Sequence, residues 1–204
     1  MDSLDPSDKA ALQAASVVGQ RFSLDLLRQL IDSVQYTCAG LVDHVLVRQE
    51  GEDYLFAHAL VREGVYSSLL KEKRQELHCS AADWFAGRDP TLHAEHLDRA
   101  DDPAAARAYL VAAETQVDQY RYELARQQVE RGLELAAEPA DKYTLTSFHG
   151  QILHDLGSAS DSIEAYQRAL EFAVDDEMTC RALLGLAAGM RIVDRFDEAL
   201  AALD

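Results

Sequence analysis

The sequence contains no long hydrophobic run, and no stretch approaches the ~18 apolar residues that a membrane-spanning helix needs. Cysteine is also scarce. Cys38, Cys79 and Cys180 are far apart and odd in number, which is typical of reduced, partly buried thiols in a cytosolic protein. The opening residues, MDSLDPSDKAALQ, lack the basic segment and apolar core of a secretory signal. We therefore expect a cytoplasmic protein without a membrane partner.

Motifs for phosphate binding and catalysis are missing as well. The pattern G-x-x-x-x-G-K-[ST], whose backbone cradles phosphates and whose lysine contacts them, does not occur. Ser67, Ser68 and Cys79 have no recognisable base partner, which nucleophilic catalysis requires. The sequence therefore predicts a chain that is not an enzyme, with no catalytic residue, no ATP hydrolysis and no cofactor of its own.

Basic residues are few relative to acidic ones. There are 36 acidic and 19 basic side chains, which give a formal net charge of -17. Such a charge repels nucleic acid and anionic membranes through long-range electrostatics. Hydrophobic residues still make up 48% of the chain, enough for a buried core. We expect a globular protein whose partners are basic or neutral and do not include nucleic acid.

Residues 1–88 show the pattern of three short helices followed by a β-hairpin and two further helices. Helix-start signals and apolar spacing place the first two helices at about residues 6–18 and 24–31. A third helix is predicted from the helical spacing of Val34, Cys38, Leu41, Val42 and Val45. Two short strands then flank an acidic turn around Gly51. Three helices followed by a hairpin is the order of a winged-helix domain.

A DNA-binding winged helix with a helical oligomerisation domain is the alternative interpretation. The segment in the place of a recognition helix, SVQYTCAGLVDH, contains no Lys or Arg, the side chains that usually contact phosphates and guanine. The hairpin tip adds the carboxylates of Glu50, Glu52 and Asp53. Both features disfavour DNA as a partner.

Residues 89–204 are rich in alanine and contain no convincing strand. Three of their segments resemble one another at a spacing of 37 residues: YELARQQVERGLELA, SDSIEAYQRALEFA and RFDEALAALD, aligned through Ala125, Ser162 and Ala199. Such a period is typical of stacked helix hairpins, because each hairpin leaves an apolar face that its neighbour covers. The sequence predicts an array of helix hairpins over 89–204, cut inside the second helix of its last copy.

Small residues predict where the two helices of each hairpin cross. Twelve residues before each aligned position lies another small residue: Ala113, Gly150 and Ala187. Small side chains at facing positions let two helices approach closely. We expect these three residues to face Ala125, Ser162 and Ala199, respectively.

The repeat resembles the tetratricopeptide repeat at its small-residue, aromatic and alanine positions, which are Gly150, Ser162, Tyr166 and Ala169. Its period of 37 residues exceeds the usual ~34. The resemblance covers about residues 103–204. It implies a mainly α-helical, right-handed solenoid whose concave surface binds a protein or a peptide.

The order of the whole chain is similar to one family, the bacterial signal-transduction ATPases with numerous domains. The region after their nucleotide-binding module resembles four segments here: ALQAASVVGQRFSLDLLRQLI, CAGLVDHVLVRQEGEDYLFAHALVREGVYSSLL, KRQELHCSAADWF and AEHLDRADDPAAARAYLVAAE. That family includes relatives of the maltose-operon activator and cyclase-associated ATPases. The resemblance implies a winged helix packed on a nucleotide-binding module outside this chain, and repeats that sense a ligand or partner. ATP or ADP would then bind the parent protein.

His58 lies at the joint between the predicted hairpin and the next helix. It is either a packing residue or a ligand contact. In related nucleotide switches, including plant and animal immune receptors, a histidine just after the wing contacts the phosphates of ADP. The stretch Phe56-Ala57-His58-Ala59-Leu60 resembles that motif, with Ala59 in place of an acid. An imidazole N–H at a helix N-terminus adds a donor where the dipole favours an anion. The resemblance implies that His58 contacts ADP in the parent protein.

The remaining histidines give weaker signals. His93 and His96 are three residues apart on a predicted helix, a tolerable spacing for two metal ligands, but no further ligand is nearby in sequence. His149 and His154 are five apart and fall on different faces of a helix. We expect no metal site, and the family resemblance implies that His96 packs inside the protein.

Overall fold

The computed structural model describes residues 4–203. The chain divides into two compact units, Met1–Asp102 and Pro103–Asp204, called unit 1 and unit 2 below. The described residues are mainly helical, with twelve helices and one three-stranded antiparallel sheet. No helix in this range has both the length and the apolar character needed to cross a membrane.

The first two helices of unit 1 begin at the residues that the sequence indicates. α1 spans Pro6–Val18, and the side chain of Asp5 accepts a hydrogen bond from the backbone N–H of Ser7. α2 spans Leu24–Leu30, and the Ser23 hydroxyl accepts one from the N–H of Leu26. These bonds satisfy N–H groups that lack partners inside a helix. Both predicted helices are confirmed.

The third predicted helix is largely wrong. α3 spans only Ala39–Asp43. Val34 and Val45 are 78% and 72% exposed, so their helical spacing does not reflect a buried stripe. Asp32 adopts a left-handed φ of 49° after α2, and Val45 adopts one of 55° after α3. A left-handed residue interrupts a right-handed helix, which is why the segment does not continue in either direction.

The sheet contains one strand more than the predicted hairpin. β2 (Val47–Glu50) and β3 (Asp53–Phe56) form that hairpin, and β1 (Arg21–Ser23) pairs with the other edge of β3, giving the order β1-β3-β2. Gly51 turns the hairpin with a φ of 65°. Arg21 on β1 forms ion pairs with Glu50 and Asp53, two of the three carboxylates at the hairpin tip. The tip is therefore less negative than the sequence alone implies.

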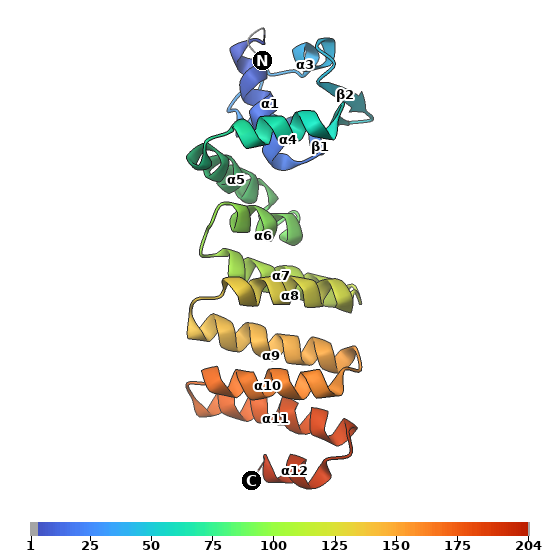
Figure 1. Cartoon of the computed structure of the whole chain (residues 1–204), viewed down its shortest axis with the longest axis vertical. Coiled ribbons are helices and arrows are strands. Elements are labelled where there is room, and N and C mark those ends of the chain that lie inside the picture. Colours follow the sequence, from blue (N-terminus) through green and yellow to red (C-terminus); the bar gives the residue numbers. More distant parts are fainter. Residues whose placement is uncertain (1–3, 204) are drawn as a thin grey trace. The chain divides into compact units, whose positions relative to one another are not determined.

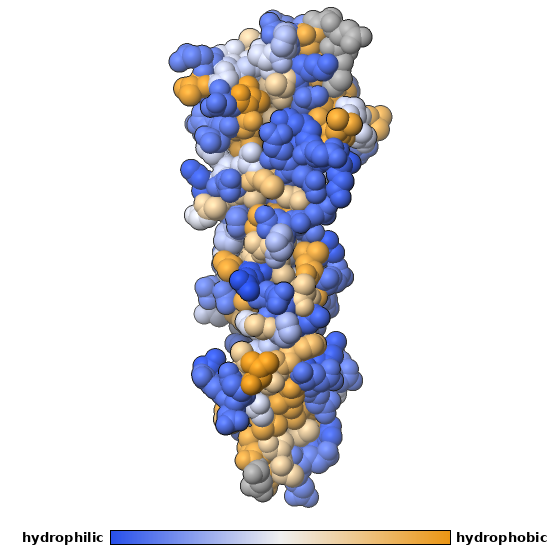
Figure 2. Space-filling model, turned by 90° about the vertical axis from the view of Figure 1, so that its left-hand side faces the viewer, coloured by the Kyte–Doolittle hydropathy of each residue, from blue (hydrophilic) through white to orange (hydrophobic). Residues whose placement is uncertain are grey.

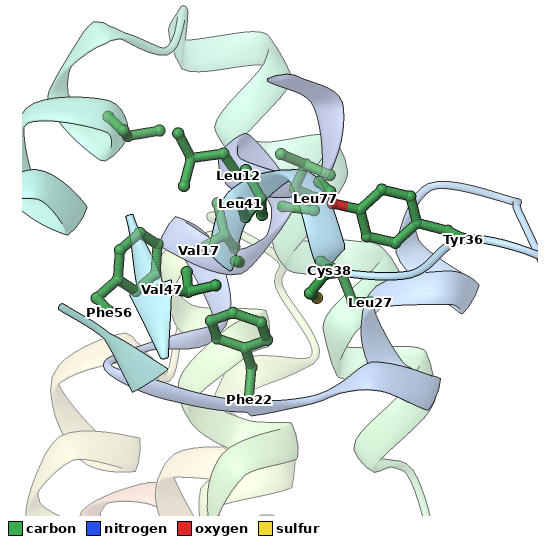
Figure 3. Close-up of a cluster of buried hydrophobic side chains, with 14 of the residues drawn as sticks. Leu12, Val17, Phe22, Leu27, Tyr36, Cys38, Leu41, Val47, Phe56 and Leu77 are labelled. Atoms are coloured by element: carbon green, nitrogen blue, oxygen red, sulfur yellow. The ribbon is translucent and has the colours of Figure 1, made fainter. Parts of the chain in front are cut away.

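The principal core cluster of unit 1 takes residues from α1, α2, α3, all three strands and the two helices that follow the hairpin (Figure 3). Leu12 and Val17 of α1 and Phe22 of β1 belong to this cluster, and Phe22 packs edge-on against Phe56 at 5.7 Å between ring centroids. Tyr36 and Cys38 join the cluster from the segment before α3. The Tyr36 hydroxyl donates to a carboxylate oxygen of Asp8 at 2.8 Å, so this buried ring keeps its polar end satisfied.

Three helices complete unit 1: α4 (Ala59–Ser68), α5 (Lys71–Phe85) and α6 (Pro90–Arg99). α4 and α5 match the two helices predicted after the hairpin. α6 packs against α5, and the compact division of the chain follows α6. The sequence predicts the boundary between residues 88 and 89, because Gly87 and Pro90 flank this position. Those residues end one helix and start the next without separating the two.

Unit 2 consists of three successive helix hairpins (Figure 1). Their bounds are α7 Ala105–Asp118 with α8 Tyr122–Leu135, α9 Pro139–Asp155 with α10 Ala159–Phe172, and α11 Asp176–Ile192 with α12 Phe196–Ala201. The second helices begin at Tyr122, Ala159 and Phe196, which repeats the 37-residue spacing. Each hairpin turns at a left-handed residue in the same repeat position: Tyr120, Gly157 and Asp194. The predicted array of helix hairpins is confirmed.

The small residues predicted at helix crossings are buried. Ala113 and Ala125 are fully buried in one cluster, and Ala187 and Ala199 share another. In the middle hairpin the Ser162 hydroxyl donates a hydrogen bond to the carbonyl oxygen of Gly150 at 2.8 Å. This bond confirms that these two positions face each other.

Candidate functional site

His58 lies at the joint that the sequence indicates. It is the N-cap residue of α4, with extended backbone angles (φ -141°, ψ 135°), and its side chain makes no capping hydrogen bond. The ring is exposed, whereas Val65 and Leu69 of the same helix are buried in the core. His58 is therefore not a core residue, and its contact with a nucleotide stays a prediction.

A groove of about 430 Å³ crosses the three hairpins of unit 2. Its walls come from the first helix of each hairpin: Leu110 and Glu114 of α7, Phe148 and Gln151 of α9, and Met178 and Arg181 of α11. We call this the hairpin groove. Its size lies within the ~300–1,000 Å³ typical of ligand sites. The sequence predicts a partner on the repeat surface without indicating its lining residues, and it identifies Tyr166 only as an aromatic position of the repeat.

Tyr166 of α10 reaches the hairpin groove through a slot between two glycines. A Cβ atom on Gly150 of α9 would lie 2.9 Å from Tyr166 Cε2, and one on Gly185 of α11 would lie 2.3 Å from its Cε1 and Cζ. Real Cβ atoms almost never come closer than 3.0 Å to another atom. The ring therefore fits only because both positions lack a side chain.

Gly185 explains why the space for the Tyr166 ring lies between α9 and α11 and not in the preceding hairpins. Repeat spacing aligns Gly185 with Val111 and Phe148 in the preceding hairpins. A side chain at this position in α11 would occupy the space that Tyr166 now uses. Burial raises the pKa of the Tyr166 hydroxyl, and Asp155 adds to the shift. The phenol is consequently neutral near pH 7 and can donate a hydrogen bond.

The hairpin groove carries more negative than positive charge. Four charged side chains line it: Glu114, Asp175, Glu177 and Arg181. Arg181 pairs with Glu177 at 2.5 Å, while Asp175 caps α11 by accepting the N–H of Met178 at 2.8 Å. Glu114 is exposed and forms no ion pair within the described part of the chain. Two carboxylates are thus left without a neutralising partner.

A second, apolar surface lies on the last hairpin. Leu184, Phe196, Leu200 and Leu203 are all at least half exposed and border a hollow of about 440 Å³. Figure 2 shows hydrophobic surface at the level of this hairpin, flanked by hydrophilic residues. The corresponding residue of Leu200 in the preceding hairpin is Ile163, which is only 4% exposed. α11 covers Ile163 there, because a Cβ on Gly189 would lie 2.9 Å from its Cγ1.

Two buried histidines face each other between α5 and α6. His78 Nδ1 lies 2.9 Å from His96 Nδ1, and His78 Nε2 lies 3.0 Å from the hydroxyl of Tyr66 on α4. The rings are 0% and 1% exposed, and Phe85 stacks on His96. Burial lowers the pKa of His78 to about 3 and that of His96 to about 4. Both rings are therefore neutral at pH 7.

This histidine pair shows what the rings of His93 and His96 contact. Those two rings do not act together: His93 Nδ1 hydrogen-bonds the carbonyl of Ala82 at 2.8 Å, while His96 contacts His78. His78 was missed because it lies 18 residues away on another helix. The packing role of His96 agrees with its burial. In the part of the chain that the structure describes, no three His, Cys, Asp or Glu residues form a group that could hold a metal ion.

His149 and His154 lie apart, on α9. His149 is buried, with Nε2 3.7 Å from a carboxylate oxygen of Glu130, and burial lowers its pKa. His154 lies beside Asp155, with Nδ1 3.4 Å from its carboxylate. Among the cysteines, Cys38 is buried, whereas Cys79 and Cys180 are exposed. The prediction of partly buried thiols therefore holds for Cys38 alone.

Comparison with known proteins adds a structural likeness. No protein-family model and no curated protein matches the sequence. One similar solved structure is described as a Signal Transduction ATPase with Numerous Domains (STAND) protein with a tetratricopeptide repeat sensor, from Pyrococcus horikoshii. The identity is 14% and the TM-score 0.46, and the match covers 98% of this chain and 37% of that chain. This chain therefore spans less than half the length of that protein. A likeness at this level does not assign a family.

Proposed function

We propose that this chain is a non-catalytic regulatory module whose helix hairpins bind a protein or peptide partner in the hairpin groove. The observation that carries the proposal is the groove itself: a cavity of about 430 Å³ with an aromatic floor, bordered by three hairpins. Sites that bind partners combine such apolar and aromatic surface with a few placed polar groups. Tyr166 supplies the ring, and Ser147, Gln151 and Glu114 supply polar groups around it.

Unit 1 serves, in this proposal, as a winged helix that packs on a nucleotide-binding module of a larger signalling or transcription-regulatory ATPase. The order of α1, α2 and α3 followed by the β2–β3 hairpin supports this interpretation. His58 supports it further, because its exposed ring occupies an N-cap without capping the helix. The helix dipole at that end favours an anion such as the phosphates of ADP.

Blocking the hairpin groove tests the proposed function. Peptides would be selected from a random displayed library against the full chain, and their affinity measured for two variants. Gln151→Trp fills the groove from an exposed position, and Gln167→Trp places the same ring on α10 away from it. We expect Gln151→Trp to weaken the selected peptides by about tenfold or more and Gln167→Trp to leave them unchanged. Equal affinity for both variants contradicts the proposal.

DNA binding by unit 1 is the alternative, and the pairing of Arg21 with Glu50 and Asp53 makes the hairpin tip less repulsive than the sequence implies. α3 nevertheless carries no basic residue. A titration with random and genomic duplex fragments at ~50 mM salt, where electrostatic binding is strongest, should give no tight complex. Sequence-selective binding at submicromolar concentration would favour the alternative.

A further inference from the structure

The uncompensated charge of the hairpin groove indicates the chemistry of its partner. Glu114 of α7 and Asp175 at the start of α11 are the two carboxylates without an ion-pair partner, and Arg181 is held by Glu177. An anionic ligand would meet this excess of negative charge and the field of a chain with a net charge of -17. A cationic group would meet a carboxylate acceptor at either position and a favourable field.

Tyr166 supplies a second contact for a cation. Its ring lines the groove beside Gly150 and Gly185, and within the described residues its hydroxyl has no hydrogen-bond partner. Lysine and arginine side chains combine an apolar stem with a charged end, so the stem can cover an aromatic ring while the end reaches a carboxylate. Leu110, Phe148 and Met178 provide apolar surface for the neighbouring part of the ligand.

The preceding hairpins contain an ion pair at the corresponding repeat positions. Arg107 of α7 donates to a carboxylate oxygen of Asp141 on α9 at 2.7 Å, which joins the two helices through a guanidinium. At the repeat positions 37 residues later stand Thr144 and Met178, which carry no charge and both line the groove. The corresponding ion pair is thus missing between α9 and α11, where Asp175 and Glu177 lie close by in sequence.

We infer that the hairpin groove binds a peptide segment with lysine or arginine beside apolar residues, its cationic groups meeting Glu114 or Asp175 and an apolar stem covering Tyr166. This inference rests on the proposed function and adds the charge and shape of the partner. The pairing of carboxylates with an aromatic floor makes the groove selective for a cation over a neutral amide of similar length.

Three matched peptides test the inference: acetyl-GALKALKG-amide, and the same peptide with both lysines replaced by glutamine or by glutamate. Affinities for the full chain would be measured by fluorescence anisotropy at ~50 mM salt, where screening is weak. We expect the lysine peptide to bind about tenfold more tightly than the glutamine peptide, and the glutamate peptide more weakly than both. Equal affinities, or no binding by the lysine peptide, overturn the inference.

Charge-neutralising variants place the effect in the groove. The double variant Glu114→Gln/Asp175→Asn removes both negative charges but keeps the shape of each side chain. Asparagine can also cap α11 in place of Asp175. It should weaken the lysine peptide by about fivefold or more and leave the glutamine peptide unchanged. The control Glu164→Gln/Glu171→Gln removes the same charge from exposed positions of α10 outside the groove. An equal loss in the control attributes the preference to the overall field and overturns the inference.

The two proposals fail in different ways. Library peptides that Gln151→Trp blocks but that show no preference for lysine would leave the proposed function intact and contradict the inference. Library peptides that Gln151→Trp does not block would contradict the proposed function itself. Lysine-dependent binding that survives Gln151→Trp would overturn the inference, because the cation would then bind elsewhere.

Discussion

The two units bury their side chains in different ways. Unit 1 has one principal cluster formed by helices and a sheet, and beside it a pair of fully buried imidazoles, His78 and His96. Unit 2 divides its buried residues among successive hairpins, where small residues such as Gly150 and Ser162 let helices approach closely. Among the described residues, unit 2 contains one buried histidine, His149, against two in unit 1. Unit 1 should therefore be the more sensitive to protonation, and unit 2 the more sensitive to side-chain volume.

Acid should produce the largest effect, and mainly in unit 1. His78 and His96 have native pKa values lowered to about 3 and about 4, whereas an unfolded histidine titrates near 6.5. Below pH 6.5 the two histidines bind protons in the unfolded chain but stay neutral in the folded protein. The free energy of unfolding therefore falls with pH until the pH reaches the native pKa values. Each ring lowers the free energy of unfolding by up to about 1.4 kcal/mol for each pH unit below 6.5, which gives a loss of ~3 kcal/mol for both rings between pH 6.5 and 5.

The single tryptophan makes this effect measurable in unit 1. Trp84 lies on α5, so its fluorescence in urea follows the unit that contains the histidine pair. The unfolding midpoint should fall steadily from pH 7 to pH 5. His78→Gln removes one of the two titrating rings and should reduce the dependence of the urea midpoint on pH by about half. His58→Gln, at an exposed position, should leave that dependence unchanged. A midpoint that stays constant over this range would falsify the assignment of a neutral buried pair.

Volume should produce the next largest effect, in unit 2. A Cβ at Gly150 would already lie 2.9–3.1 Å from three atoms of the Tyr166 ring, so Gly150→Leu overpacks the crossing of α9 and α10. We expect a loss of roughly 1–3 kcal/mol in the free energy of unfolding. Gly64→Leu is the matched control in unit 1, because a Cβ there meets nothing within 4 Å.

Circular dichroism at 222 nm during urea unfolding compares the two glycine variants. Gly64 is exposed inside α4, where leucine is the better helix former, so this variant should be unchanged or up to ~1 kcal/mol more stable. If the free energy of unfolding falls equally in both variants, unit 2 is not more sensitive to side-chain volume than unit 1. If Gly150→Leu is as stable as the original chain, the repeat register at this crossing is misassigned.

The same contrast explains how much of the fold the sequence predicts. The hairpins of unit 2 are predictable because each copy repeats its small residues and its turn after 37 residues. In unit 1 the spacing of Val34 and Val45 imitates a helix, yet both are exposed, because left-handed residues interrupt the chain on either side of α3. β1 was missed because three residues are too few for an alternating pattern to be recognised.

The candidate sites divide in a similar way. The position of His58 was predicted correctly because a strand-to-helix joint is a local feature. The hairpin groove could be predicted only as a surface of the array. Its floor depends on Gly185 making room for a ring that comes from another helix, at residue 166. The His78–His96 contact likewise joins two helices and has no signal in the spacing of either.

The smallest predicted effect concerns His58, where unit 1 departs from a local rule of helix formation. Its backbone already has N-cap geometry, but its imidazole does not cap α4. Asparagine in its place could accept a backbone N–H of the first turn, so His58→Asn should raise the free energy of unfolding by roughly 0.5–1 kcal/mol. His58→Ala removes no hydrogen bond and should change it by less than ~0.5 kcal/mol. The Trp84 fluorescence midpoint in urea measures both.

A gain of stability on losing His58 would mean that the histidine serves something other than folding. In a parent protein with a nucleotide-binding module, His58→Ala should then release ADP faster, because losing one charge-assisted hydrogen bond typically costs ~1.5–3 kcal/mol. Such a loss corresponds to more than about tenfold in affinity and shifts a two-state switch towards its open form. If both substitutions instead destabilise unit 1 by more than ~1 kcal/mol and ADP exchange in the parent is unaltered, His58 is a structural residue.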